Sequence, residues 1–327
     1  MVGKNTLSVG DCQEVLKIVS ENSVDSCITD PPYGMGMEEW DHSVPTKELW
    51  QEVYRVLKPG AFCLSFCSPR LYHRMACAIE DAGFVIKDQI MWMVTTKMPK
   101  INGLKPAHEP IVVAQKPFKG SISENFEKWG VGKIDVINTR VPWDKKPPTG
   151  WVAQGGKRRT FGRDKKHARA SVTKTKKEVW VLKETNEVVN FGNVDANPNG
   201  RHPSNIIGEV LPEHQKYFYA PRVTRKERGE YNDHPTPKPI SLMSYLIKIY
   251  CPESGLVLDP FCGSGSTGIA ALLENRDFWG IDLDQHFVDI TQKRIQDYVF
   301  NKKEETNESK SIQNATRCKA TGTSIQN

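Results

Sequence analysis

Two blocks of the chain alternate short apolar runs with amphipathic stretches, and this alternation constrains the fold most. Between residues 5 and 95, runs such as "VDSCITD" and "AFCLSF" are separated by helical patterns such as "TKELWQEVYRVLKPG". After residue 231 the same rhythm returns with "ISLMSYLIKIY", "LVLD" and "DFWGID". Strands that alternate with helices predict a parallel sheet covered on both faces. We therefore expect an α/β fold with one doubly wound, mostly parallel sheet that two separate chain segments build together.

One pair of runs breaks the alternation. "FVIKDQIMWMV" and "EPIVVAQK" follow one another without a stretch of helical length between them. Parallel neighbours need a long crossover, whereas antiparallel neighbours do not. We expect these two strands to pair antiparallel at an edge of the sheet.

The middle of the chain, residues 116–230, is rich in Pro, Gly, Asn and basic residues and has poor helical periodicity. From Arg140 to Glu178 it contains 13 Lys and Arg against three acids, a local net charge of +10. Because the whole chain carries +6, the remainder sums to −4. A basic segment interleaved with aromatic residues, as in "WVAQGGKRRTFGRDKKHARA", indicates a polyanion partner, although a solvated charge run is the simpler alternative.

These patterns divide the chain into four regions. We predict a catalytic domain formed by 1–115 and 231–300, an inserted basic region at 116–230, and a disordered tail at 301–327. The tail is polar and has few large apolar residues.

The eight cysteines indicate reduced thiols in a cytoplasmic protein. Most lie in apolar runs, and none forms a CxxC pair or a Cys/His cluster with the spacing of zinc ligands, so we expect no metal. The N-terminal residues lack the apolar core of a secretory signal, and no apolar run approaches the ~20 residues that span a bilayer, so we expect no membrane association.

The stretch "CITDPPYGMG", residues 27–36, ends a short apolar run in an acid, two prolines and a tyrosine. Proline fixes φ and removes an amide donor, so a strand must stop here. Each proline also holds the residue before it in an extended conformation. The segment alone is equally consistent with a plain turn between a strand and a loop.

The stretch "LVLDPFCGSGSTG", residues 256–268, is a strand that ends in an acid and runs through a glycine-rich turn into a helix. Gly263 and Gly265 allow a sharp turn and let a ligand approach the main chain closely. We interpret the turn as lacking both the lysine of a P-loop and the third glycine of a dinucleotide fingerprint, which argues against those ligands. Asp282, which ends the next strand, can accept hydrogen bonds from both ribose hydroxyls, so we interpret this site as one for a nucleoside without a pyrophosphate.

Three motifs together resemble those of amino-group DNA methyltransferases that use S-adenosylmethionine. They are "DPPY" at 30–33, "HPTPKP" at 234–239 and "LDPFCGSGST" at 258–267. Their order, with the catalytic motif first, resembles the circularly permuted β class, which places its target-recognition region between the motifs. The resemblance covers roughly residues 5–300, and the flanking stretches look similar to phage and prophage members. It implies a class I methyltransferase fold, double-stranded DNA as substrate, a bacterial or phage source and a location with the nucleoid in the cytoplasm. It leaves open whether the chain forms a homodimer and whether a partner restriction enzyme completes a restriction-modification system.

The resemblance also implies site residues. The catalytic set is Asp30, Pro31, Pro32 and Tyr33. The cofactor-binding set is Asp11, Thr236, Lys238, Asp259, Phe261, Gly263, Gly265, Thr267 and Asp282. From the basic run we add, as DNA-binding residues, Lys157, Arg158, Arg159, Arg163, Lys165, Lys166 and Arg169. Two alternatives stay open: Asp11 can simply cap the helix that follows it, and Pro237 and Pro239 can simply begin a helix.

A physical reason for "DPPY" follows from the chemistry of the exocyclic amine of a base. Its lone pair is delocalised into the ring, which makes it a poor nucleophile. Hydrogen bonds from both N–H groups, to the Asp30 carboxylate and the Pro31 carbonyl, would draw the nitrogen toward tetrahedral geometry. Tyr33 would stack on a base turned out of the duplex, offsetting part of the few kcal/mol lost on unstacking.

Several functions remain open at this level. Adenine N6 is the favoured target, cytosine N4 is the alternative, and an RNA amino-methyltransferase fits the permuted order less well. A catalytically silent DNA-binding protein would differ from all three because it would shift DNA without transferring a methyl group.

Overall fold

The computed structural model describes residues 5–36, 41–94, 107–141, 150–154, 172–174, 180–182, 190–194, 202–208 and 223–300. The chain divides into two compact units, one formed by residues 1–139 and 204–327 and the other by 140–203. The smaller unit lies within the region predicted as an insertion, 116–230. Helix α4 (Ile122–Trp129) and strand β10 (Ile206–Gly208), which also lie in that region, belong to the larger unit.

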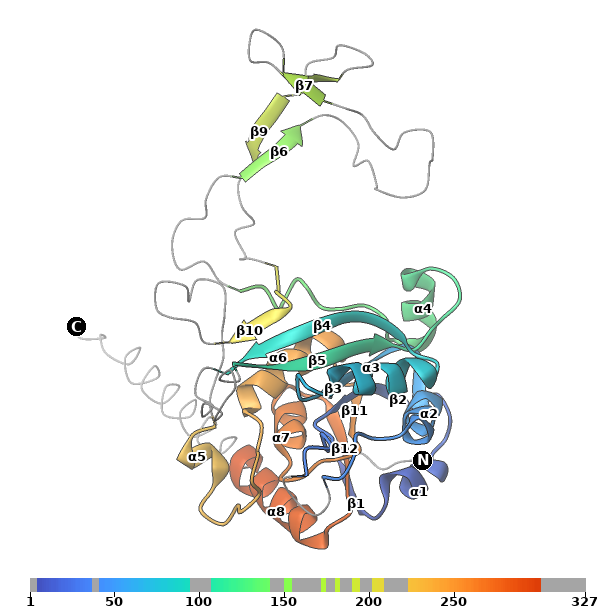
Figure 1. Ribbon diagram of the computed structural model, residues 1–327, viewed down its shortest axis with the longest axis vertical. Coiled ribbons are helices and arrows are strands. Elements are labelled where there is room, and N and C mark those ends of the chain that lie inside the picture. The colour runs from blue at the N-terminus through green and yellow to red at the C-terminus, as the bar shows by residue number, and fades with distance from the viewer. Residues whose placement is uncertain are drawn as a thin grey trace, which may run out of the picture. The chain divides into compact units, whose positions relative to one another are not determined.

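The larger unit contains an eight-stranded sheet in the order β1-β12-β11-β2-β3-β5-β4-β10. Its strands are β1 (Thr6–Val9), β2 (Val24–Thr29), β3 (Leu57–Phe66), β4 (Val85–Met93), β5 (His108–Gln115), β10, β11 (Leu256–Asp259) and β12 (Asp277–Asp282). All neighbours pair parallel except β5, which is antiparallel to both β3 and β4. The mostly parallel sheet and the antiparallel pairing predicted from sequence are therefore confirmed (Figure 1). The predicted position of this pair at an edge of the sheet is wrong, because β10 pairs with β4 and forms the edge strand.

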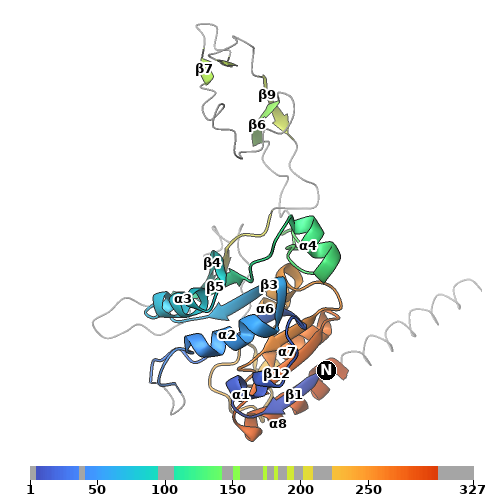
Figure 2. The same cartoon turned by 90° about the vertical axis from the view of Figure 1, so that its right-hand side faces the viewer.

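Helices cover both faces of this sheet (Figure 1, Figure 2). They are α1 (Cys12–Lys17), α2 (Lys47–Val56), α3 (Tyr72–Asp81), α4, α5 (Arg225–Arg228), α6 (Ile240–Tyr250), α7 (Ser266–Leu273) and α8 (Gln285–Ile295), with a π-helical turn at Gln296–Phe300. Alternate residues of each strand face opposite layers. Thus Cys27 packs in the core with α1, α2 and α3, whereas the next residue, Ile28, packs in the core with α6 and α7.

Helices α8 and α2 follow their sequence patterns in part. Asp284 caps α8 by accepting a hydrogen bond from the His286 N–H at 2.9 Å. The apolar face of α2 is buried as its spacing predicts, at Leu49, Trp50 and Val53. Helix α2 passes at once into β3, because Leu57 already lies in the strand.

The smaller unit contains two antiparallel ribbons within its described residues. One pairs β6 (Gly150–Gln154) with β9 (Asn190–Val194), and the other pairs β7 (Val172–Lys174) with β8 (Trp180–Leu182).

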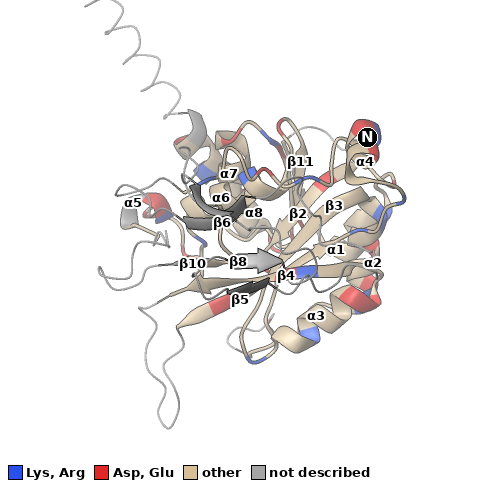
Figure 3. Ribbon diagram, turned by 90° about the horizontal axis from the view of Figure 1, so that it is seen from above, with Lys and Arg blue, Asp and Glu red and all other residues tan. Residues whose placement is uncertain are grey.

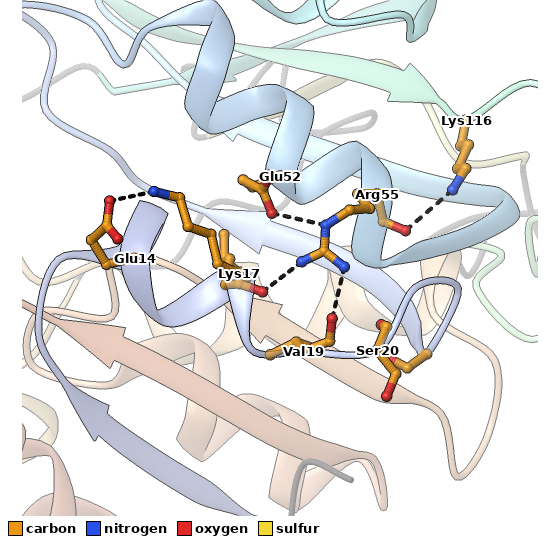
Figure 4. A network of polar contacts seen from close by, with 9 residues as sticks. Glu14, Lys17, Val19, Ser20, Glu52, Arg55 and Lys116 are labelled. Atoms are coloured by element: carbon orange, nitrogen blue, oxygen red, sulfur yellow. Dashed lines mark hydrogen bonds and ion pairs between the residues drawn. The ribbon is translucent and has the colours of Figure 1, made fainter.

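A polar network ties α1 to α2 (Figure 4). The Arg55 guanidinium donates to the Leu16 and Val19 carbonyl oxygens at 2.7 Å each, which satisfies carbonyls at the end of α1. Lys116, at the end of β5, donates to the Leu57 carbonyl at 2.7 Å. Because β5 runs antiparallel to β3, the last residues of β5 lie toward the start of β3. This contact therefore lies at the amino-terminal ends of the parallel strands, opposite their carboxyl ends.

Candidate functional site at the carboxyl ends of the strands

The two motif-bearing strands are neighbours. Strand β2 leads into Asp30 and strand β11 ends at Asp259, and the two pair parallel with Cys27 opposite Leu258. The Thr29 hydroxyl donates to the Asp259 carboxylate at 2.7 Å, across 230 residues of sequence. These strands therefore lie side by side, and both loops begin at the carboxyl ends of the strands, where α/β folds bind ligands.

Two glycines shape the loop after β11. Gly263 and Gly265 have φ values of +48° and +79°, a region that disfavours side chains. A Cβ on Gly265 would lie 2.5 Å from Thr291 Cγ2, so α8 packs directly on the loop. The Thr291 hydroxyl donates to the Gly263 carbonyl oxygen at 2.7 Å, and the buried Arg294 donates to the Ser264 carbonyl oxygen. The loop is therefore held in shape by α8.

Gly268 was missed by the sequence analysis. With Gly263 and Gly265 it completes a Gly-x-Gly-x-x-Gly spacing. A Cβ on Gly268 would lie 2.5 Å from the Phe278 ring, so its absence lets α7 pack closely on β12. The glycine spacing by itself therefore does not exclude a dinucleotide, and the nature of the ligand must come from other observations.

Asp282 ends β12 beside the glycine loop. Its carboxylate accepts the Gly263 N–H at 2.8 Å and the Asp284 N–H at 3.1 Å. A carboxylate has about four acceptor positions, so these two bonds fix Asp282 and leave capacity for a ligand's hydroxyl groups. Burial raises the pKa of Asp282, and the backbone N–H donors offset part of that rise.

Asp259 lies deeper, with 2% of its surface exposed. It accepts hydrogen bonds from the hydroxyls of Thr29 and Thr267 and from the Phe261 N–H. Burial nevertheless raises its pKa to about 6. A buried carboxylate of this kind is stabilised in its ionised form by a cationic group, such as a ligand ammonium.

The catalytic motif begins where β2 stops. The Tyr33 hydroxyl donates to Asp30 Oδ1 at 2.6 Å. Pro31, which follows Asp30 in the sequence, is buried. Asp41 closes the loop that follows, because its two carboxylate oxygens accept the N–H groups of Gly34 at 2.6 Å and Met35 at 3.0 Å. Asp30 and the Pro31 carbonyl are thus carried by a segment fixed at both ends.

The segment "HPTPKP" lies between the two loops. His234 contacts the glycine loop, because a Cβ on Gly263 would lie 2.7 Å from His234 Nε2. Burial lowers the pKa of His234 to about 4, so its imidazole is neutral at pH 7. Arg228 fixes this segment by donating to the carbonyl oxygens of Asn232 at 3.1 Å and His234 at 2.7 Å.

Lys238 lies elsewhere in the site than the sequence analysis expected. Its ammonium pairs directly with Asp30, and Glu109 Oε2 lies 3.9 Å away. Burial alone would lower the pKa of Lys238, but Asp30 and Glu109 outweigh it and raise the pKa above its ordinary value. Burial raises the pKa of Asp30, and Lys238 offsets part of that rise.

Glu109 was also missed by the sequence analysis. Glu109 is the second residue of β5. Because β5 runs antiparallel to its neighbours, the first residues of β5 lie beside the carboxyl ends of the parallel strands. The acid in "HEPIVVAQ", just before an apolar run already predicted to be antiparallel, was the signal that could have located it.

The remaining predicted residues are placed as follows. Asp11 caps α1 by accepting the Gln13 N–H at 2.8 Å, which is the simpler of the two alternatives, and it stands beside β12 because the Gly10 N–H donates to the Asp282 carbonyl oxygen at 2.9 Å. Thr236 is exposed, and Pro239 is the N-cap of α6. The seven basic residues proposed for DNA binding, and the tail 301–327, lie outside the described residues.

Charged residues of both signs lie along α2 and along α3 (Figure 3). The seven cysteines in the part of the chain that the structure describes are free, and no group of three His, Cys, Asp or Glu side chains within it is arranged to hold a metal ion. No described helix has the length and apolar character that a bilayer crossing requires.

The residues fit S-adenosylmethionine. Asp282 keeps acceptor capacity for the ribose hydroxyls, the buried acid at Asp259 suits the ammonium, and both lie beside the glycine loop.

Comparison with known proteins agrees with this fit. The N6/N4 DNA methylase family profile matches residues 24–293. The chain is 23% identical over 350 residues to the Type II methyltransferase M.HindIII of Haemophilus influenzae, with 86% of this chain and 91% of that protein covered. It is 26% identical over 299 residues to M.HpaI of Haemophilus parainfluenzae, with 88% of this chain and 73% of that protein covered.

Solved structures share the fold. The M1.HpyAVI complex with its cofactor superposes with a TM-score of 0.50 at 20% identity, covering 89% of this chain and 98% of that one. The cytosine-N4-specific PvuII DNA methyltransferase superposes with a TM-score of 0.53 at 15% identity, covering 90% of this chain and 87% of that one. The family profile covers most of the chain and includes both site loops. The chain therefore belongs to the N6/N4 DNA methylase family and is a DNA methyltransferase whose cofactor is S-adenosylmethionine.

Proposed function

We propose that this enzyme methylates the N6 amine of adenine in double-stranded DNA, at a specific site and on a base turned out of the helix. The observation that carries the proposal is the Thr29–Asp259 hydrogen bond, because it joins the loop bearing Asp30 to the loop expected to hold the cofactor. The preference for adenine rests on the Asp-Pro-Pro-Tyr sequence of the catalytic motif.

Asp30 and Pro31 would activate the amine. The carboxylate and the Pro31 carbonyl each accept one N–H of the amine, which localises the lone pair on nitrogen. The cofactor supplies an electrophilic methyl group on a sulfonium. Asp30 would accept the proton that the nitrogen loses when it takes up this methyl group. Tyr33 donates to Asp30 and so fixes the carboxylate while this happens.

Asp282, Asp259 and the glycine loop would hold the cofactor. Asp282 accepts from the ribose hydroxyls, and Asp259 faces the ammonium. The backbone of Gly263 and Gly265 allows close approach. Holding the methyl group and the amine in line supplies much of the acceleration, since proximity alone can contribute several kcal/mol.

DNA recognition would fall to the predicted insertion at 116–230. The local charge of +10 between Arg140 and Glu178 supports a role for this region in binding phosphates. The relatives named above are Type II methyltransferases, which supports a site-specific reaction. We place the enzyme with bacterial or phage DNA in the cytoplasm.

Cytosine N4 is the second candidate, since one structure with the same fold is cytosine-N4-specific. Nucleoside mass spectrometry distinguishes the two. DNA incubated with the enzyme and a cofactor labelled in its methyl group is digested to nucleosides and analysed. Label in N6-methyl-2′-deoxyadenosine supports the proposal. Label only in N4-methyl-2′-deoxycytidine overturns the choice of base, and no label in DNA overturns the function.

A further inference from the structure

Four side chains form a closed polar cluster at the catalytic motif. Asp30 receives the Tyr33 hydroxyl on Oδ1 and the Lys238 ammonium on Oδ2, and Glu109 lies 3.9 Å from the same ammonium. Tyr33 also lies 3.4 Å from Glu109. These residues come from three separate parts of the chain, so the fold itself brings them together.

The cluster is well shielded from water. The side chains of Lys238 and Glu109 are 9% and 10% exposed, and that of Asp30 is 20% exposed. The rings of Phe66 and Tyr33 lie 5.4 Å and 5.7 Å from the ammonium. One cation thus serves two carboxylates in a site of low dielectric, where an ammonium without an anionic partner is costly.

This arrangement conflicts with the proposed reaction unless one group moves. The Lys238 ammonium is an N–H donor on the same carboxylate that must accept an N–H of the base amine. The ammonium therefore occupies the position on the Asp30 carboxylate that the amine of the base needs. It can leave Asp30 only if another anion takes it, and Glu109, which already lies 3.9 Å from the ammonium, is placed to do so.

We propose that Glu109 is a positioning residue that receives the Lys238 ammonium when the target base enters, so that Asp30 is released to accept the amine. The proposal rests on the proposed function of Asp30. The ammonium already interacts with both carboxylates, so the move keeps its contact with Glu109 and gives up only the one with Asp30. Glu109 acts only through Lys238 and does not touch the reacting atoms.

A double-mutant cycle tests this role. The variants are Glu109→Gln, Lys238→Met and the two combined, assayed for single-turnover methyl transfer at saturating DNA and cofactor. Glu109→Gln should slow transfer on the order of 10- to 100-fold, because the ammonium then has no second anion and stays on Asp30. In the Lys238→Met background the same change should cost nothing or restore activity, since no cation is left to hold.

Three outcomes overturn the proposal. An equal loss in both backgrounds would make Glu109 a structural residue that acts independently of Lys238. No loss in the wild-type background would mean that the ammonium never needs to leave Asp30. Dissociation constants for DNA and for cofactor, measured by calorimetry on every variant, should stay within about threefold of wild type, and a large rise in the Glu109→Gln constants would assign the rate loss to binding instead.

A matched pair elsewhere controls for loss of an ion pair. Lys248 and Glu274 pair at 3.0 Å, and Glu274 lies between α7 and β12, at the edge where the parallel strands begin. Glu274→Gln and Lys248→Met should leave transfer unchanged in single and double form. Failure of the proposed function is recognised separately, because wild-type enzyme would then label no DNA and no cycle could be measured.

Discussion

Gly265 offers a direct test of the cofactor loop. Its φ of +79° lies in the left-handed region, where an alanine costs about 1–2 kcal/mol. The added Cβ would also lie 2.5 Å from Thr291 Cγ2 and 2.8 Å from its Oγ1, and overpacking of this kind costs about 1–3 kcal/mol. Gly265→Ala should therefore lower the free energy of unfolding by about 2–5 kcal/mol.

The same change should weaken cofactor binding. Thr291 can relieve the clash only by moving, and the move breaks its 2.7 Å hydrogen bond to the Gly263 carbonyl oxygen. Since the loop would then lose its shape, we expect the dissociation constant for S-adenosylmethionine to rise about tenfold or more, the equivalent of 1.4 kcal/mol.

Gly130→Ala is the matched control. Gly130 ends α4 with a φ of +75°, but a Cβ there would have no atom within 4 Å. It should lose only the backbone contribution of about 1–2 kcal/mol and keep wild-type cofactor affinity. Urea unfolding and isothermal calorimetry measure both quantities. Equal destabilisation in the two variants, or unchanged cofactor affinity in Gly265→Ala, would refute the reasoning.

Three further predictions concern charge. Asp30→Ala should slow methyl transfer on the order of 100- to 1,000-fold in a single-turnover assay while cofactor affinity by calorimetry is retained; near-normal turnover would remove Asp30 from the mechanism. Burial raises the pKa of Asp259 from an ordinary 3.8 to about 6, so the folded state binds this proton more tightly than the unfolded state. The free energy of unfolding should therefore fall by about 3 kcal/mol as pH rises from below 4 to above 6. Urea midpoints for Asp259→Asn should lack this loss, and a pH profile identical to wild type would count against it. Neutralising Lys165, Lys166 and Arg169 should make the slope of log affinity for DNA against log salt shallower by ~2.7, whereas an unaltered slope would leave that run a solvated surface.

Much of the catalytic unit follows from local sequence. Strands such as β2 and β11 are short apolar runs that end in an acid, and their parallel pairing follows from the helices between strands. That Asp30 and Asp259 lie in one site was also predictable. Both residues follow parallel strands, and ligands in such sheets lie beyond the carboxyl ends of the strands.

What local sequence did not provide are the contacts between side chains that come from distant segments. Lys238 was expected at the cofactor, yet its long flexible side chain pairs with Asp30, because two carboxylates attract one buried cation. Glu109 was not singled out, because its position at the active edge depends on the antiparallel direction of β5, which places the start of a strand where its neighbours end. Gly268 was overlooked although its Gly-x-Gly-x-x-Gly spacing is present in the sequence, and only its packing against Phe278 required the structure.

The proposed mechanism requires that two groups lie next to each other in one site. They are the base amine, held by Asp30 and the Pro31 carbonyl, and the methyl donor on the loop after β11. A crystal structure with a target duplex and a non-reactive cofactor analogue measures this directly. We predict an everted adenine with its N6 atom within hydrogen-bond distance of the Asp30 carboxylate and the Pro31 carbonyl oxygen, in line with the analogue on the Gly263–Gly265 loop. A base bound away from Asp30, or an analogue bound away from that loop, would contradict it.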